Sequence, residues 1–309
     1  MNEVVRVAAA QVAPVFLDRD ASVAKACETI ARVGAAGAEL VVFPETYVPG
    51  YPYWVVVHDP TETGKFQRKL VEQSVEIPSP STDALCAAAR ESSCFVCIGV
   101  NERDGHTLYN TLLFIDAEGR IAGKHRKLVP TNHERMVWGR GDGRDLRVFD
   151  TPLGKIGGLI CYEHGNALFR YAIQAQHEEI HVSVWPGGMP SIHGIIDAAI
   201  RSYAFEGSSF VINATSILTD EILEALGTGG STAKLAPGGG YSAIVAPRGA
   251  LLAGPEDHGE ESLIYADLER ERVTDAKLVV DCAGHYTRPD VVRLQIRGTA
   301  SEPLDILPD

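Results

Sequence analysis

The stretch KIGGLICYEH, residues 155–164, decides the fold prediction. Apolar residues and glycines dominate its first half, which predicts a short buried strand. Cys161 stands where this strand ends, Gly165 and Asn166 break the pattern, and residues 167–176 predict a helix. A strand that turns sharply into a helix presents the side chain at the turn and frees nearby backbone N–H groups. Cys161 is therefore a candidate nucleophile, and the alternative is a buried core cysteine.

The rest of the chain predicts further strands and helices in alternation. Apolar runs predict strands at residues 4–12, 40–45, 94–100, 108–115, 120–123, 181–185, 209–213, 241–245, 251–252 and 262–266. Helical spacing of apolar residues predicts helices at residues 61–75, 82–92, 192–205 and 268–278, and another that starts at Asp20 as its N-cap. No linker or short repeat divides the chain. The pattern predicts an α/β fold of mixed sheets stacked on one another, each covered by helices on one side.

Composition excludes several classes of partner. The 309 residues carry a net charge of −13, with 45% hydrophobic residues, so a nucleic acid or an anionic membrane is not expected to bind. No apolar run approaches the ~18 residues that span a bilayer, and the N-terminus does not resemble a signal peptide. The six cysteines lack the spacing of a disulfide framework, which predicts reduced thiols and a cytoplasmic location.

One cysteine pair has the spacing of a possible metal site. Cys94 and Cys97 form a C-x-x-C, but an odd separation places them on opposite faces of the predicted strand 94–100. A zinc site also needs a second pair of ligands, which the sequence does not offer. No metal is expected here.

Two further residues are candidates to act with Cys161. Glu45 ends the predicted strand 40–45, and Lys127 lies in the basic cluster 124–127, within a predicted long loop. A free thiol titrates near ~8.5 and needs a base, which Glu45 can supply. A lysine lowers the pKa of a thiol and stabilises negative charge on the attacked group. The alternative for the basic cluster is a solvated face.

Three motifs in order resemble the signatures of the nitrilase superfamily. They are VVFPET at 41–46, HRKLVPT at 125–131 and GGLICYE at 157–163. Three more blocks are similar to the true nitrilase branch of these carbon-nitrogen hydrolases: HERMVWGRGDG at 133–143, HVSVWPG at 181–187 and HYTRPD at 285–290. The resemblance implies a stacked α-β-β-α sandwich as a single domain over residues 1–290, followed by a short tail at 291–309.

The resemblance also implies a catalytic set and an assembly. Glu45, Lys127 and Cys161 form a triad, and Glu134 is a second glutamate that holds the lysine and the proton network in place. The alternative for Glu134 is an exposed residue paired with Arg135. No metal or organic cofactor is implied, and the protein is expected to form a homo-oligomer, either a dimer or a larger spiral.

The implied reaction is hydrolysis of an organic nitrile to the carboxylic acid and ammonia, through a thioimidate and a thioester on the cysteine. One alternative is an amidase or carbamoylase with the same triad. Another is a catalytically silent binding or assembly protein on the same fold, which labelling of a single fast thiol by iodoacetamide would distinguish.

Aromatic residues are the candidates for the substrate pocket. Tyr51, Tyr162 and Trp185 are expected to bind substrate, although any core also uses such bulky residues. The sequence departs from the branch at two positions, with Tyr162 where Trp is usual and Asn132 where Tyr is frequent. Neither departure removes a catalytic group, so both bear on substrate preference.

Overall fold

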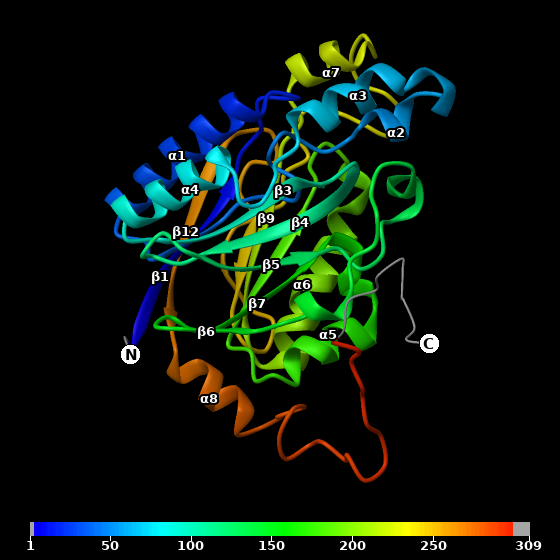
Figure 1. Ribbon diagram of the computed structural model, residues 1–309. Helices are drawn as coiled ribbons and strands as arrows, with labels where there is room; N and C mark the ends of the chain where they lie inside the picture. The colour runs from blue at the N-terminus through cyan, green and yellow to red at the C-terminus, as the bar shows by residue number, and fades with distance from the viewer. Residues whose placement is uncertain (1–2, 299–309) are drawn as a thin grey trace, which may run out of the picture.

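Two six-stranded sheets form the centre of the computed structural model, which describes residues 3–298 (Figure 1). The first sheet has the strand order β12-β1-β2-β3-β4-β5, and the second has the order β11-β10-β9-β8-β7-β6. The inner strands β1, β2 and β3 of the first sheet run parallel, as do β7, β8 and β9 of the second, while the outer pairs are antiparallel. The two sheets are therefore mixed, as expected.

The strands have the following bounds. The first sheet contains β1 Val4–Gln11, β2 Leu40–Val42, β3 Phe95–Asp104, β4 Thr107–Ile115, β5 Ile121–Arg126 and β12 Ser262–Glu269. The second sheet contains β6 Phe149–Thr151, β7 Gly154–Ile160, β8 Ile180–Trp185, β9 Phe210–Thr215, β10 Ala243–Val245 and β11 Leu251–Ala253.

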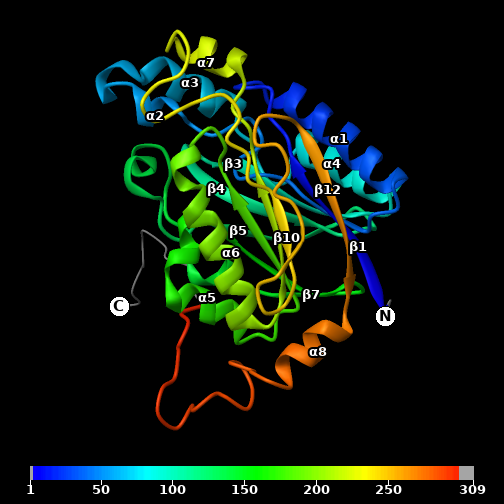
Figure 2. The same cartoon turned by 180° about the vertical axis from the view of Figure 1, so that it is seen from behind.

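Helices cover the outer face of each sheet, which confirms the four-layer sandwich (Figures 1 and 2). The first sheet is covered by α1 Arg19–Ala35 and α4 Pro80–Glu91, and the second by α5 Ala167–Gln174 and α6 His193–Gly207. Beyond one end of the strands lie α2 Trp54–Val57, α3 Gly64–Gln73 and α7 Asp220–Leu226, and α8 Glu271–Lys277 follows β12 at the other end. Over residues 3–298, no helix combines the length and apolar character needed to cross a bilayer.

The core has one part between the sheets and another beneath α1 and α4. Cys97 packs in the part between the sheets, whereas Cys94 packs under the helices. Both thiols are buried and free. The prediction that they face opposite sides of the strand is confirmed.

Two local predictions were wrong, and one helix was missed. The N-cap of α1 is Asp18 rather than Asp20, because the Asp18 carboxylate accepts a hydrogen bond from the backbone N–H of Ala21. Strand β5 continues to Arg126, so most of the basic cluster lies on a strand and not in a loop. Helix α7 was not expected at all. The C-terminal residues 299–309, which hold most of the predicted tail, lie outside the described residues.

Candidate active site

Cys161 stands directly after β7, where the sequence placed it. The chain turns there into a 3₁₀ helix, Cys161–Gly165, and then into α5. Cys161 has a φ of 55°, in the left-handed region that few non-glycine residues adopt. The backbone N–H of Tyr162 donates to the Cys161 sulfur, and the Cys161 carbonyl oxygen lies 2.7 Å from His164 Nδ1. The turn thus presents a buried sulfur with a backbone N–H donor beside it.

Glu45 lies in the turn after β2 and faces the same space. Gly99 on β3 lets this turn approach closely, because a Cβ at Gly99 would collide with the backbone on both sides of Glu45. Asn110 on β4 donates through Nδ2 to Glu45 Oε1 at 2.6 Å. The other oxygen, Oε2, is buried and accepts no hydrogen bond from the described residues. One oxygen is therefore held while the other stays available as a proton acceptor.

Lys127 follows β5 and is buried, not part of a solvated face. Its ammonium donates to Glu45 Oε1 at 2.9 Å and to Glu134 Oε2 at 2.8 Å. A buried charge needs such partners, because desolvation of an unpaired ammonium is strongly unfavourable. The two carboxylates hold the ammonium in one position.

Glu134 is buried in the 3₁₀ helix Asn132–Met136, so the exposed alternative is wrong. Its Oε2 accepts from the backbone N–H of Thr131 at 2.7 Å as well as from Lys127. Its Oε1 accepts from the Tyr51 hydroxyl at 2.9 Å. Both carboxylate oxygens of Glu134 accept hydrogen bonds. Glu134 is therefore suited to orient Lys127 rather than to accept a proton.

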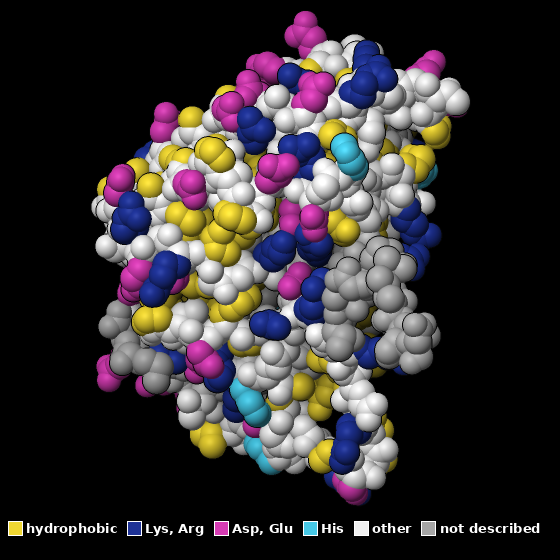
Figure 3. All heavy atoms as spheres, in the orientation of Figure 1, with side chains coloured by type: hydrophobic (Ala, Val, Ile, Leu, Met, Phe, Trp, Pro, Cys, Tyr) yellow, Lys and Arg dark blue, Asp and Glu magenta, His cyan; other side chains and the backbone are white. Residues whose placement is uncertain are grey.

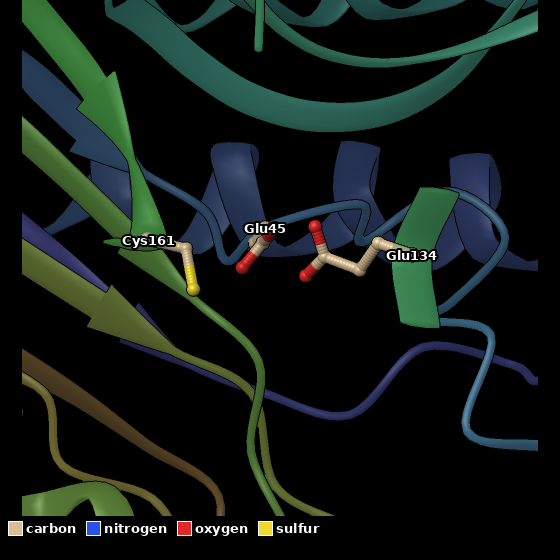
Figure 4. A group of neighbouring side chains, drawn as sticks. All are labelled: Glu45, Glu134 and Cys161. Atoms are coloured by element: carbon tan, nitrogen blue, oxygen red, sulfur yellow. The ribbon is translucent and has the colours of Figure 1, made fainter. Parts of the chain in front are cut away.

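The catalytic candidates come from both sheets and meet at one point. Figure 4 shows the side chains of Glu45, Glu134 and Cys161 pointing into the same space. One oxygen of each carboxylate and the Cys161 sulfur lie within 4.8 Å of one another. This donor set could in principle hold a metal ion, but the Lys127 ammonium already bonds to both carboxylates and supplies the local positive charge. The donor set is therefore already used by a lysine.

Burial sets the protonation states of the site. It raises the pKa of Glu45 to about 7, against the lowering effect of Lys127. Burial and the Glu45 charge hold the pKa of the Cys161 thiol well above its ordinary value. Burial disfavours the charged form of Lys127, yet the neighbouring Cys161 and Glu134 raise its pKa well above its ordinary value. The resting site thus pairs a neutral thiol with an ammonium and with a carboxylate that titrates near neutrality.

A buried carboxylate that the sequence analysis did not single out ties the two sides of the site together. Glu163 accepts from the backbone N–H of Ile160, which precedes Cys161, at 2.8 Å, and from that of Leu128, which follows Lys127, at 2.9 Å. His125 Nε2 lies 2.9 Å from the same carboxylate. Burial opposes ionisation, but His125 and the two N–H groups lower the pKa of Glu163.

Of the three expected pocket aromatics, Tyr51 and Tyr162 line a cavity of about 430 Å³ that reaches Cys161. Trp185 is not among the residues that line it. Its ring and that of Tyr162 meet edge to face, with centroids 5.6 Å apart, and the Trp185 ring stacks on His164. Substrate contacts by these residues remain predictions. Asn110, which holds Glu45, was missed because it lies 65 residues away in sequence and carries no motif.

Comparison with known proteins assigns the chain to a family. The carbon-nitrogen hydrolase family model matches residues 6–278. The chain belongs to the carbon-nitrogen hydrolase family. Among curated members, a nitrilase of Paraburkholderia phymatum is 41% identical, over 98% of this chain and 89% of the relative. An aliphatic nitrilase of Rhodococcus rhodochrous is 40% identical, over 97% of this chain and 84% of the relative.

A solved structure of the superfamily has the same fold. The Nit3 protein of Saccharomyces cerevisiae, a member of branch 10 of the nitrilase superfamily, superposes with a TM-score of 0.72 at 21% identity. The match covers 92% of this chain and 96% of that one. The resemblance read from the sequence motifs is therefore confirmed at the level of family and fold.

Proposed function

We propose that this carbon-nitrogen hydrolase is a nitrilase, which converts an organic nitrile and two waters into the carboxylic acid and ammonia. The observation that carries the proposal is the ammonium of Lys127, held between Glu45 and Glu134 beside the Cys161 sulfur. Curated nitrilases at about 40% identity over nearly the whole chain support it.

In the first step the Cys161 sulfur attacks the nitrile carbon. Glu45 accepts the thiol proton, for which Oε2 is free. The nitrile nitrogen gains negative charge as the carbon–sulfur bond forms, and Lys127 and the Tyr162 N–H are the donors placed to stabilise it. Glu45 passes the thiol proton on to the nitrogen, so the product is a neutral thioimidate on Cys161 and Glu45 is again a carboxylate.

Two waters complete the reaction. Glu45 activates the first water, which adds to the thioimidate carbon to give a tetrahedral centre. The protonated nitrogen leaves as ammonia, and a thioester remains on Cys161. Addition of the second water to the thioester releases the carboxylic acid and restores the thiol. No step needs a redox change, because hydrolysis leaves the oxidation level of the carbon unchanged.

A substrate panel tests this proposal against the amidase and carbamoylase alternative. Purified protein is incubated with aliphatic, arylacetic and aromatic nitriles and with the matching amides and N-carbamoyl compounds, and ammonia is measured. Turnover of at least one nitrile class, absent in Cys161→Ala, supports the proposal. Turnover of amides or carbamoyl compounds alone contradicts it. Failure of iodoacetamide to label Cys161 faster than the other thiols, with no turnover at all, favours a silent protein.

We also propose that the protein assembles with copies of itself. Leu168 on α5 and Phe205 on α6 expose 62% and 56% of their surface. The segment after α8 extends away from the sheets and exposes Tyr286 and Val292 (Figures 1 and 2). Exposed apolar patches mark interaction sites. Light scattering on eluted protein is expected to give a dimer or larger species, and Leu168→Glu is expected to reduce its size; a monomeric wild type contradicts the proposal.

The surface and the cysteines bear on partners and location. Lys and Arg side chains are interspersed with Asp and Glu over the described part of the face in Figure 3. A small molecule, rather than a nucleic acid or a membrane, is the partner we propose. All six cysteines lie within the described residues and are free, which supports the proposed cytoplasmic location.

A further inference from the structure

The cavity above Cys161 has two chemically different ends. The buried end is formed by the sulfur of Cys161, only 2% exposed, together with Tyr51 and Glu134. At the outer end the lining residues are exposed, namely Asn132, His133, Tyr162 and Lys234. A ligand that fills the cavity therefore extends from a reactive sulfur to a lysine at the mouth.

The walls between these ends are largely apolar. The aliphatic and thioether side chains that line the cavity are Val55, Val56, Pro186, Met189 and Ile192. Pro186 and Val55 are buried, and the others are partly buried. Apolar walls favour the binding of a hydrocarbon chain or ring, and they provide few hydrogen-bond partners for a polar group.

Lys234 is the only lysine or arginine among the residues that line the cavity. Glu134 is the only acidic residue among them, and its carboxylate already bonds to Lys127, Tyr51 and Thr131. Lys234 forms no ion pair with any residue in the range 3–298. Its Nζ donates to the backbone carbonyl of Val56 at 3.2 Å, which holds the amine beside another residue of the cavity.

The backbone around Lys234 is held in place. The next residue, Leu235, is buried against α2, α3 and α7. Ala236 donates its backbone N–H to the carbonyl of Gly188 at 3.0 Å, next to Met189 of the cavity wall. The lysine therefore has a fixed attachment point at the mouth, while its side chain can adjust to a ligand.

We propose that the preferred substrates are nitriles whose apolar body ends in a carboxylate, with the nitrile at Cys161 and the carboxylate paired with Lys234. This inference rests on the proposed nitrile hydrolysis. An unpaired ammonium at the end of an apolar cavity matches a monoanion better than a neutral group. The protein as a whole carries a net charge of −13, which repels anions, so a local cation is needed to admit one.

Dinitriles provide a consequence of this arrangement. Hydrolysis of one nitrile group of a linear dinitrile yields a cyanocarboxylate, the class of substrate that Lys234 favours. The released intermediate competes well with the remaining dinitrile for the site. The reaction should therefore proceed to the dicarboxylate rather than stop at the cyanocarboxylate.

The test compares charged and neutral nitriles of the same shape. The probes are ω-cyanocarboxylates with three to six methylene groups and the matching ω-cyano methyl ketones, in which a methyl replaces one carboxylate oxygen. Each is assayed at low salt with wild type, Lys234→Met and the control Lys69→Met. Lys69 is an exposed lysine on α3 that does not line the cavity.

For at least one chain length, wild type and Lys69→Met are expected to favour the carboxylate over the ketone in kcat/KM by about three- to fivefold, the effect of one solvent-screened ion pair. Lys234→Met is expected to lose this preference through a higher KM for the carboxylate, with the ketone changed less than about twofold. The preference of the wild type should also fall as salt is raised.

Equal ratios in wild type and Lys234→Met at every chain length would overturn the inference, as would a wild type that hydrolyses only the ketones. If Lys234→Met does not fold, the preference for the carboxylate is measured in Lys234→Gln and in the wild type at increasing salt, and an unchanged preference in both overturns the inference. Hydrolysis of the neutral ketones reports on the proposed function by itself. Loss of charge preference and failure of nitrile hydrolysis are therefore separate results.

Discussion

The ammonium of Lys127 bonds to one oxygen of Glu45, at 2.9 Å, and leaves the other oxygen free. This arrangement lets one carboxylate do two things at once. Its bonded oxygen fixes the lysine where negative charge develops during attack, while its free oxygen can take a proton. Because both groups are buried, each interaction is stronger than it would be in water.

Replacing the second carboxylate should lower activity without unfolding the chain. Glu134→Gln keeps the shape of the side chain but removes the charge that, together with Glu45, holds Lys127. We expect kcat to fall by about 100-fold, which corresponds to ~2.7 kcal/mol of barrier. Steady-state kinetics and circular dichroism check this. The control is Glu261→Gln, which removes an exposed ion pair with Lys25 and should keep the wild-type kcat. A wild-type kcat in Glu134→Gln as well would show that the charge of Glu134 is dispensable.

The pH profile should report the pKa of Glu45. The base must be ionised to accept the thiol proton, so kcat/KM should rise with pH through about 7. Asn110→Leu removes a hydrogen bond that lowers the pKa of Glu45, so the rising limb should move to higher pH. The control is Thr111→Val. It removes a buried hydroxyl on the same strand that donates to Glu102 and not to Glu45, so the rising limb of the pH profile should stay in place. If the rising limb of the pH profile stays at the same pH in Asn110→Leu, Glu45 is not the base.

Only one of the buried cysteines should be needed for turnover. Cys161→Ser should abolish measurable nitrile hydrolysis, because a hydroxyl is a far weaker nucleophile than a thiol near neutrality. Cys97→Ser should keep most activity, since Cys97 stands inside strand β3 rather than at a strand end, and its thiol packs in the core between the sheets. Rates per folded protein decide this. A folded but inactive Cys97→Ser would show that the nucleophile has been misassigned.

The sequence predicted the layers of this fold because its central strands are uniformly apolar. It did not predict that β5 would run through Lys124 and Arg126, since that stretch is polar. The strand pairs with β4 through its backbone, and both side chains pair with Glu102 of β3, at 2.5 Å each. Such pairing across a sheet leaves no mark in local periodicity. Helix α7 has only seven residues and presents too short a pattern to detect.

The same distinction, between local patterns and long-range contacts, holds for the active site. Cys161 and Glu45 could be predicted because each ends an apolar run, and Lys127 because it stands in a motif. The bonds that set their chemistry could not be predicted, since the Tyr51–Glu134 pair joins residues 83 apart in sequence. Glu163 lies two residues after the nucleophile in sequence, yet the hydrogen bond it accepts from the Leu128 N–H depends on how the two sheets stack.

Product partition should follow the basicity of the nitrogen in the tetrahedral centre. Ammonia leaves only if that nitrogen is protonated; otherwise the sulfur leaves and the amide is released. Lys127 disfavours a second positive charge nearby, and Glu134 offsets it. We expect mainly acid, with an amide fraction that grows as electron-withdrawing groups are placed beside the nitrile. Chromatography of both products across a matched series checks this. A constant amide fraction would contradict the account.

The proposed mechanism requires Cys161 to become covalently attached to the nitrile carbon, and this adduct can be trapped. Wild type is mixed with a slow nitrile substrate, quenched in acid within the first turnover, digested and examined by mass spectrometry. We predict that the peptide containing Cys161 gains the mass of the nitrile, or that of its acyl form in which oxygen replaces NH. Turnover with no adduct on that peptide, or an adduct on another cysteine, would contradict the account.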